Sequence, residues 1–309
     1  MSPPSRYASA FARRLLALTR EAPAASEGDA ESVHRFRVAS RRLRAALPAL
    51  PPDAPARAGN PGSIRKQART LTRAFGGVRE LDVSLGLLDE YSAAHPDLRR
   101  TLRSMRGPIA RERSARRRQM LRTLRQIDPA ALAARIRTLV AESDTAEGHA
   151  RRRARLADRV EARTAELAAQ MDAVGQLYAP FRLHPVRIAA KKLRYALELA
   201  RELHGVPTLA LTRRLKAVQD QLGRLHDLEV LTAWTRVVRS RPAATRARRA
   251  AVSAVIDAEI ARLHAGYLGQ QPLLAFVLAR CRTHTLPALR EPQSAGPLEL
   301  VSASGREAS

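Results

Sequence analysis

The sequence predicts an all-α fold, and three observations lead to that prediction. The apolar residues are mostly Ala and Leu, while aromatic residues make up only 4% of the 309 positions. Runs of β-branched residues are scarce, so intrinsic preference favours helices over strands. Prolines and glycines also separate amphipathic segments of helical length. A hydrophobic fraction of 45% is an ordinary supply for a packed core, so we expect a folded protein.

The breaks fix the expected helices in order along the chain. They fall at Pro23, the proline-rich linker 51–62, Pro96, Gly107-Pro108, Pro129, Gly148, Pro180, Pro207, Pro242, Pro272 and Pro287. We expect helices at 5–21, 33–49, 63–91, 97–126, 129–143, 149–177, 185–203, 208–237, 243–268 and 273–284. The tail 291–309 has turn formers and little apolar periodicity, so it is predicted to be disordered.

The charge balance points to an anionic partner. The chain has 55 Lys and Arg against 29 Asp and Glu, a formal net charge of +26. Such an excess attracts polyanions, among them nucleic acids, anionic membranes and inorganic phosphates. Composition therefore predicts that the partner is negatively charged. Its chemical class has to be inferred from where the cations lie.

Cysteine usage and hydropathy indicate a cytoplasmic protein. The single cysteine, Cys281, excludes an intramolecular disulfide and a multi-cysteine metal site, and we expect it to be a small buried hydrophobe. No stretch approaches the roughly 20 apolar residues of a membrane span. The start of the chain has no secretory hydrophobic region. It resembles an Arg- and Ser-containing transit peptide, but a first helix is the better interpretation.

Two motifs occur twice, in the same order. "HRFRVASRRLRAAL" begins at His34 and "HPVRIAAKKLRYAL" at His184, an offset of 150. "GGVRELDV" begins at Gly76 and "GRLHDLEV" at Gly223, an offset of 147. Two motifs at nearly one offset predict a duplicated unit of about 150 residues. We therefore expect one domain over 5–290 with two helical halves, 5–148 and 149–290.

The first motif predicts a helix with a cationic stripe. At 100° per residue, His34, Arg37, Arg41 and Arg44 share an arc of about 80° and extend about 15 Å along the helix. The apolar residues lie on the opposite side: Phe36, Ala39, Leu43, Ala46, Leu47 and Leu50. The second motif repeats the stripe with His184, Arg187, Lys191 and Arg194.

Neither stripe carries an acid that would neutralise it. The segments 34–50 and 184–197 contain no Asp or Glu. The like charges of each stripe therefore repel one another, and no i,i+4 ion pair within the segment reduces that repulsion. Repeating this in both halves suggests an external anion. Pro185 favours the first helical position, which places His184 at or just before the helix start, where backbone N–H groups attract anions. We expect affinity to rise on acidification through the histidine range.

The second motif contributes acids and further cations. Glu80, Asp82, Asp227 and Glu229 are candidates for orienting cations or for a structural role. His226 stands where the first half has Arg79. Cations on the same long helices could face the stripes; they are Lys66, Arg69 and Arg73 in the first half and Arg213, Arg214 and Lys216 in the second.

With both repeats in view, the chain resembles a CHAD protein, the conserved histidine α-helical domain, over roughly 5–290. The resemblance implies two four-helix bundles related by a pseudo-twofold axis, a basic central groove or pore, and binding of inorganic polyphosphate. The site residues it implies are His34, Arg37, Arg41, Arg42, Arg44, Lys66, Arg69, His184, Arg187, Lys191, Lys192, Arg194, Arg213 and Lys216. Arg42 and Lys192 lie at the edge of their stripes.

The sequence departs from the family in two places and lacks its frequent companion. Arg79 replaces a common histidine, and the linker 51–62 puts access to the groove in doubt on that side. The alternating Glu-x-Glu-x-Lys of a CYTH domain is absent. We therefore expect a stand-alone binding module, attached to polyphosphate granules if such granules are present.

Other functions stay open. The Arg-rich stretch 99–125 resembles a phosphate-binding strip, and DNA or RNA is expected to associate weakly at low salt. Few aromatic residues are available for stacking on single strands. A phosphoryl-processing enzyme is disfavoured, because no phosphate loop is present and the stripes lack metal-holding acids. A membrane-surface role ranks lowest. No cofactor, metal or catalytic residue is expected.

Overall fold

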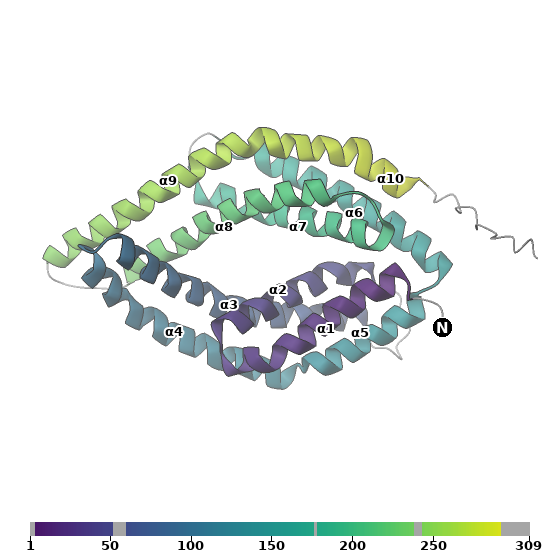
Figure 1. Cartoon of the computed structure of the whole chain (residues 1–309), viewed down its shortest axis with the longest axis horizontal. Helices are drawn as coiled ribbons and strands as arrows, with labels where there is room; N and C mark the ends of the chain where they lie inside the picture. Colours follow the sequence, from purple (N-terminus) through teal and green to yellow (C-terminus); the bar gives the residue numbers. More distant parts are fainter. Residues whose placement is uncertain (1–3, 52–59, 176–177, 238–242, 292–309) are drawn as a thin grey trace, which may run out of the picture.

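The protein is helical throughout the part described by a computed structural model, which comprises residues 4–51, 60–175, 178–237 and 243–291 (Figure 1). These residues contain no strand, and the all-α prediction is confirmed. The helices are α1 (Arg6–Glu27), α2 (Ala30–Ala46), α3 (Pro61–Ala94), α4 (Arg99–Gln126), α5 (Pro129–Ser143), α6 (Ala146–Asp172), α7 (Pro180–His204), α8 (Leu209–Val237), α9 (Ala243–Arg280) and α10 (Leu286–Arg290). A 3-10 turn follows α2 at Leu47–Ala49, and a π-helical turn at Cys281–Thr285 joins α9 to α10.

The helices form two layers (Figure 1). In the first, α2 packs against α1 and α3, α4 packs along α3, and α5 packs against α1. In the second, α7 lies between α6 and α8, and α9 packs against α8. The layers touch where α7 meets α1 and α2, where α8 meets α3, and where α9 meets α4. The helices that carry the repeated motifs thus meet their counterparts across the boundary.

Short polar residues begin several helices. The side chains of Ser5, Asp29 and Asp128 accept hydrogen bonds from backbone N–H groups in the first turns of α1, α2 and α5. Such caps satisfy N–H groups that have no partner inside the helix, and each stabilises by about 1 kcal/mol. Gly205 ends α7 with a left-handed φ of 71°. A side chain there would be strained and would also collide with the guanidinium of Arg6.

The apolar side of the first motif lies in the core, as predicted. Phe36 and Leu43 are at most 1% exposed, and the ring of Phe36 packs on Phe75 of α3 with centroids 4.0 Å apart. Full burial of a Leu or Phe side chain contributes about 1.5–3 kcal/mol. Because these residues occupy one side of α2, the opposite side is left for its cations. Cys281 is also buried, as expected.

Four prolines that we expected at breaks or helix starts lie inside helices instead. Pro23 is within α1, Pro108 within α4, Pro185 within α7 and Pro272 within α9. The prediction that Pro185 begins its helix is wrong, because Pro180 holds the first position of α7. His184 therefore lies in the second turn of α7 and not at its start.

The split at Pro272 is wrong for an energetic reason. A proline in a helix removes one backbone hydrogen bond and costs about 3 kcal/mol. Beyond Pro272, Leu274, Val277 and Leu278 are all buried, and burial of about 1.5–3 kcal/mol for each such side chain exceeds that penalty. The helix therefore continues to Arg280.

Two further predictions concern residues outside the described part. Most of the linker 51–62, namely residues 52–59, and all but the first residue of the tail 291–309 lie there. Among the described helices, none is long and apolar enough to cross a lipid bilayer.

Candidate anion-binding site

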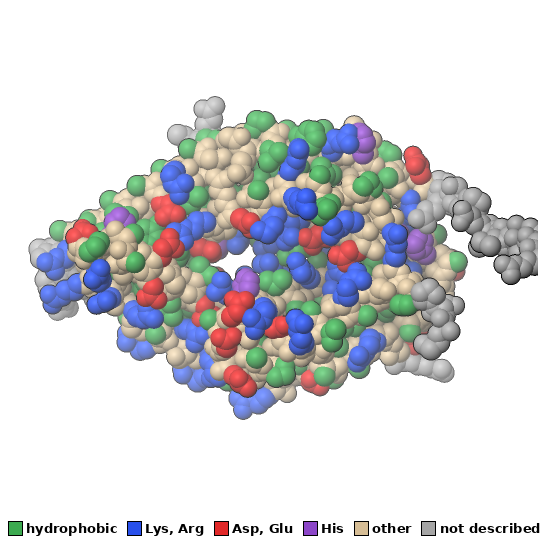
Figure 2. Space-filling view, in the orientation of Figure 1, with side chains coloured by type: hydrophobic (Ala, Val, Ile, Leu, Met, Phe, Trp, Pro, Cys, Tyr) green, Lys and Arg blue, Asp and Glu red, His purple; other side chains and the backbone are tan. Residues whose placement is uncertain are grey.

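An opening runs between the two layers near the middle of the molecule. Figure 2 shows Lys, Arg, His and acidic side chains around it. Helices α2 and α7, which carry the two repeated stripes, contact each other between the layers. Their apolar sides are buried in their own layers, so their cationic sides are the ones left to face each other.

Five cations from the two stripes form a central cationic cluster: Arg37, Arg41 and Arg44 on α2, and Arg187 and Lys191 on α7. Burial, followed by repulsion from Arg187 and Arg41, lowers the pKa of Lys191 to about 7. Burial and repulsion from Arg41 and Arg187 lower the pKa of Arg37 to about 10, so this group stays charged at neutral pH. The sequence-predicted stripes are thus brought together into one region of positive charge.

The central cationic cluster lacks carboxylate partners among the described residues. None of its five members forms an ion pair there, although many arginines elsewhere do. The Nε atoms of Arg37 and Arg41 and the Nδ1 atom of His34 are buried without a hydrogen-bond partner in the described part of the chain. Buried polar groups are normally hydrogen-bonded. These donors are therefore available to an external acceptor.

Both motif histidines border the cluster and are poised to stay neutral. Burial, then repulsion from Arg79, lowers the pKa of His34. Burial, then repulsion from His226 and Arg187, lowers the pKa of His184. The rings of His184 and His226 lie 5.2 Å apart between centroids. Positive surroundings disfavour imidazolium, and a nearby anion favours it.

The candidate acids divide into two kinds. Asp227 of α8 lies among cations including Arg187 and Arg37; burial raises its pKa, and these cations oppose the rise. Glu229 accepts a hydrogen bond from the Tyr178 hydroxyl at 2.6 Å. Asp82 is paired with Arg113 of α4 and serves to join α3 to α4. Asp227 therefore partly offsets the charge of the central cationic cluster, and Glu229 and Glu80 also act on its member Arg187.

Two arginines outside the predicted site set also lie near the cluster. Arg79 on α3 is the main charge that lowers the pKa of His34, and it also acts on Arg37 and Asp227. Arg73 and Arg69 act on Arg44. In the repeated second motif, Arg79 of the first half corresponds to His226 of the second half. This correspondence is the feature of the sequence that could have identified Arg79 as a site residue.

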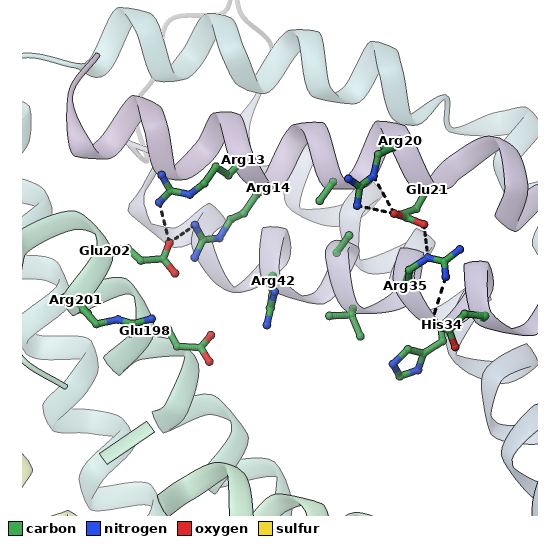
Figure 3. A pocket seen from close by; sticks show the side chains of 14 residues that line it. Arg13, Arg14, Arg20, Glu21, His34, Arg35, Arg42, Glu198, Arg201 and Glu202 are labelled. Carbon is green, nitrogen blue, oxygen red and sulfur yellow. Dashed lines mark hydrogen bonds and ion pairs between the residues drawn. The ribbon is translucent and has the colours of Figure 1, made fainter. Parts of the chain in front are cut away.

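Arg42 leads into a neighbouring cavity of about 600 Å³ between α1, α2 and α7. Figure 3 shows Arg42 and His34 pointing from α2 into this space, across from Glu198 and Arg201 of α7. Glu202 closes one end by pairing with Arg14 at 2.6 Å. The cavity is lined by both arginine and glutamate side chains, whereas all five members of the central cationic cluster are basic.

The remaining predicted site residues differ in how available they are. Lys192 pairs with Glu166 at 2.6 Å. Arg194 contacts Gln219 at 3.0 Å and pairs with Glu198 one turn further along α7, so the expectation that the second stripe has no i,i+4 ion pair is wrong at Arg194. Lys216 pairs with Asp220 on its own helix. Three others are exposed and without a carboxylate partner in the described residues; they are Lys66, Arg69 and Arg213.

Comparisons with known proteins agree with this architecture. The sequence model described as CHAD domain matches residues 9–236. The crystal structure of the CHAD domain from the plant Ricinus communis is similar, with 24% identity, a TM-score of 0.56 and coverage of 93% of this chain and 92% of that one. PptA from Streptomyces chartreusis is also similar, with 16% identity, a TM-score of 0.55 and coverage of 91% and 99%. No curated protein matches the sequence.

Proposed function

Because the chain belongs to the CHAD domain family, we propose that it binds inorganic polyphosphate, without chemical turnover, in the opening between α2 and α7. The central cationic cluster holds successive phosphates of the chain, and His34 and His184 contribute at its border. Arg42, Lys66, Arg69 and Arg213 extend the basic surface away from this centre, while Lys192, Arg194 and Lys216 contribute once their carboxylate partners are displaced.

We further infer that the two layers descend from one duplicated unit and are related by a pseudo-twofold axis. The motif offsets of 150 and 147 residues support this, as does the meeting of α2 with α7 and of α3 with α8. In a twofold arrangement a surface meets its own counterpart. Duplication of one cationic helix therefore produces a two-sided site without any further change.

The single observation that carries the proposal is the convergence of five cations, none of which forms an ion pair with a described carboxylate. Such a group repels itself, and a polyanion that enters it relieves the repulsion and satisfies the free Nε donors. Arg offers a planar fork that matches phosphate oxygens, and Lys offers a point charge. Polyphosphate has no bases, so it gains nothing from the aromatic platforms that are scarce here.

A non-catalytic role follows from the kind of residues at the centre. Phosphoryl transfer usually relies on carboxylates that hold Mg²⁺ and on a residue that orients the nucleophile. Each stripe is free of acids over 34–50 and 184–197. Asp227, an acid that acts on the cluster, lies among arginines that would compete with a metal cation for it.

The test is binding to polyphosphate of defined length as salt is increased. We expect a steep loss of affinity with salt, as counterion release predicts for several phosphate contacts. The variant R37E/R41E/R187E/K191E should bind at least 100-fold more weakly at physiological salt. A control with the same change in net charge at scattered exposed positions, R137E/R182E/R248E/R282E, should lose far less affinity. Equal binding by wild type and the first variant would exclude the opening as the site.

A further inference from the structure

The outer surface of α4 carries a second concentration of unpaired cations. We define the α4 arginine face as seven exposed arginines that form no ion pair with a described carboxylate: Arg99, Arg100, Arg103, Arg111, Arg118, Arg122 and Arg125. The helix contains 11 arginines and a single acid, Glu112. Glu112 pairs with Arg116, so it leaves the α4 arginine face without a partner.

The α4 arginine face occupies one side of the helix. At 100° per residue its members span an arc of about 140°, opposite the buried Leu102, Met105, Ile109 and Met120. From Arg99 to Arg125 the helix rises about 39 Å. Helix α4 packs mainly along α3, at the outer edge of the first layer (Figure 1). The face is therefore separate from the opening between α2 and α7.

Core packing explains the apolar side of α4 but not its arginines. An exposed helical side needs good helix formers, which Gln, Glu and Lys also supply. Like charges at i,i+4 spacing, such as Arg118 and Arg122, weaken the helix by a few tenths of a kcal/mol per pair. A polyanion bound along the face would remove that repulsion.

The shape and composition of the face select among polyanions. An interfacial membrane helix inserts an apolar side, but the apolar residues of α4 are buried in the protein. Single strands bind by stacking on aromatic rings, and residues 99–126 contain none. A flexible chain would lose conformational freedom on a convex surface that encloses nothing.

A rigid duplex avoids that loss. Its phosphates already hold fixed positions, and one helical turn of B-form DNA is about 34–36 Å long, close to the length of the face. Phosphate contacts position a protein without reading sequence. We propose that the α4 arginine face binds the phosphate backbone of duplex nucleic acid without sequence preference. The protein can then hold a duplex on its outside independently of the ligand in its central opening.

The experiment measures binding of a 30-base-pair duplex of arbitrary sequence by fluorescence anisotropy at several salt concentrations. We expect R100E/R111E/R118E/R122E to lower duplex affinity at least tenfold and to reduce the slope of log affinity against log salt by two or more, since each phosphate contact contributes about 0.9. Polyphosphate binding by this variant should change little. R100Q/R111Q/R118Q/R122Q, with helical content checked by circular dichroism, separates lost contacts from disturbed folding.

Two controls make the outcome decisive. R137E/R182E/R248E/R282E changes net charge equally and should retain most duplex affinity. R37E/R41E/R187E/K191E should also retain it while losing polyphosphate. Unchanged duplex binding by the α4 variants would overturn the proposal, as would an equal loss in the scattered control. Loss of binding to anionic phospholipid vesicles, with duplex binding intact, would assign the face to a membrane instead.

Discussion

Lys191 on α7 lies beside Arg41 on α2, and the two cations repel each other although 150 positions separate them in the sequence. This repulsion, together with burial and the charge of Arg187, brings the pKa of Lys191 to about 7. The amine is thus about half protonated at neutral pH. A phosphate beside it favours the ammonium form, so ligand binding and protonation of Lys191 are coupled.

The first prediction is a fall in polyphosphate affinity as pH rises through 7. The protonated cluster carries one more positive charge, so affinity is greatest below the pKa of Lys191 and is lost above it. Between pH 6 and pH 8 we expect a loss of about tenfold, the limit for one coupled proton. Titration calorimetry in buffers of different ionisation enthalpy should show proton uptake near pH 7. Lys191→Arg stays charged over this range, so its affinity should change little between pH 6 and pH 8. An equal loss of affinity in that variant would show that Lys191 is not the titrating group.

The second prediction concerns the histidines, which titrate in a different window. The pKa values of His34 and His184 in the free protein are lowered by burial and neighbouring cations, so both are neutral at pH 7 and their contribution to affinity grows as acidification protonates them. Changing both to Gln should remove the gain in affinity on acidification below pH 6.5 and leave the lysine step in place. The same titrations check this. If the acid-side gain survives in the double variant, the histidines do not act on the ligand.

The third prediction is a gain in affinity on removing an acid. Asp227 lies among Arg187, Arg37 and Arg79, and its carboxylate repels a bound phosphate. Asp227→Asn should tighten polyphosphate binding by about fivefold at pH 7.5, from roughly 1 kcal/mol for one charge at close range in a water-like medium. Asp158→Asn, at an exposed acid that forms no ion pair with any described residue, should leave affinity unchanged. Weaker binding by the Asp227 variant would mean that this acid orients the cations instead.

The fourth prediction concerns the contact that joins the layers at α3 and α8. Arg224 of α8 donates to Glu90 of α3 at 2.8 Å and to Glu259 of α9 at 3.0 Å. Arg224→Gln should lower the free energy of unfolding by about 1 kcal/mol, a modest figure because Glu90 is solvent-exposed. Chemical denaturation measures this. Arg290→Gln breaks a pair with Glu161 that is half exposed on both sides and should change stability less; equal effects would argue against a joining role for Arg224.

The amphipathic pattern of the first motif was sufficient to predict its local structure. Phe36 and Leu43 repeat at helical spacing and are buried, and the cations of the same segment take the opposite side. Helix α5 has the predicted bounds. Where prediction failed at Pro272, a local rule about proline was outweighed by the burial of the apolar residues that follow it; at Pro185 the helix had already begun at Pro180.

The availability of individual cations could not be predicted in the same way. Arg187 and Lys192 were both predicted to be site residues, yet Arg187 joins the central cationic cluster while Lys192 pairs with Glu166 of α6. Arg79 was seen only as a departure from a motif, and the fold brings it next to His34. Ion pairs between helices depend on which helices pack together, and that choice is not encoded within one helix.

Periodicity, charge and motif spacing were enough to predict a helical, strongly cationic relative of CHAD proteins, because all three can be read along the chain without knowing how helices pack. Which surfaces meet depends on the fold, which brings the two motif helices face to face, leaves five of their cations without an ion pair among the described residues, and places the exposed arginines of α4 on the outside. Burial and repulsion depend on distance in space, and packing of the two layers is what sets those distances.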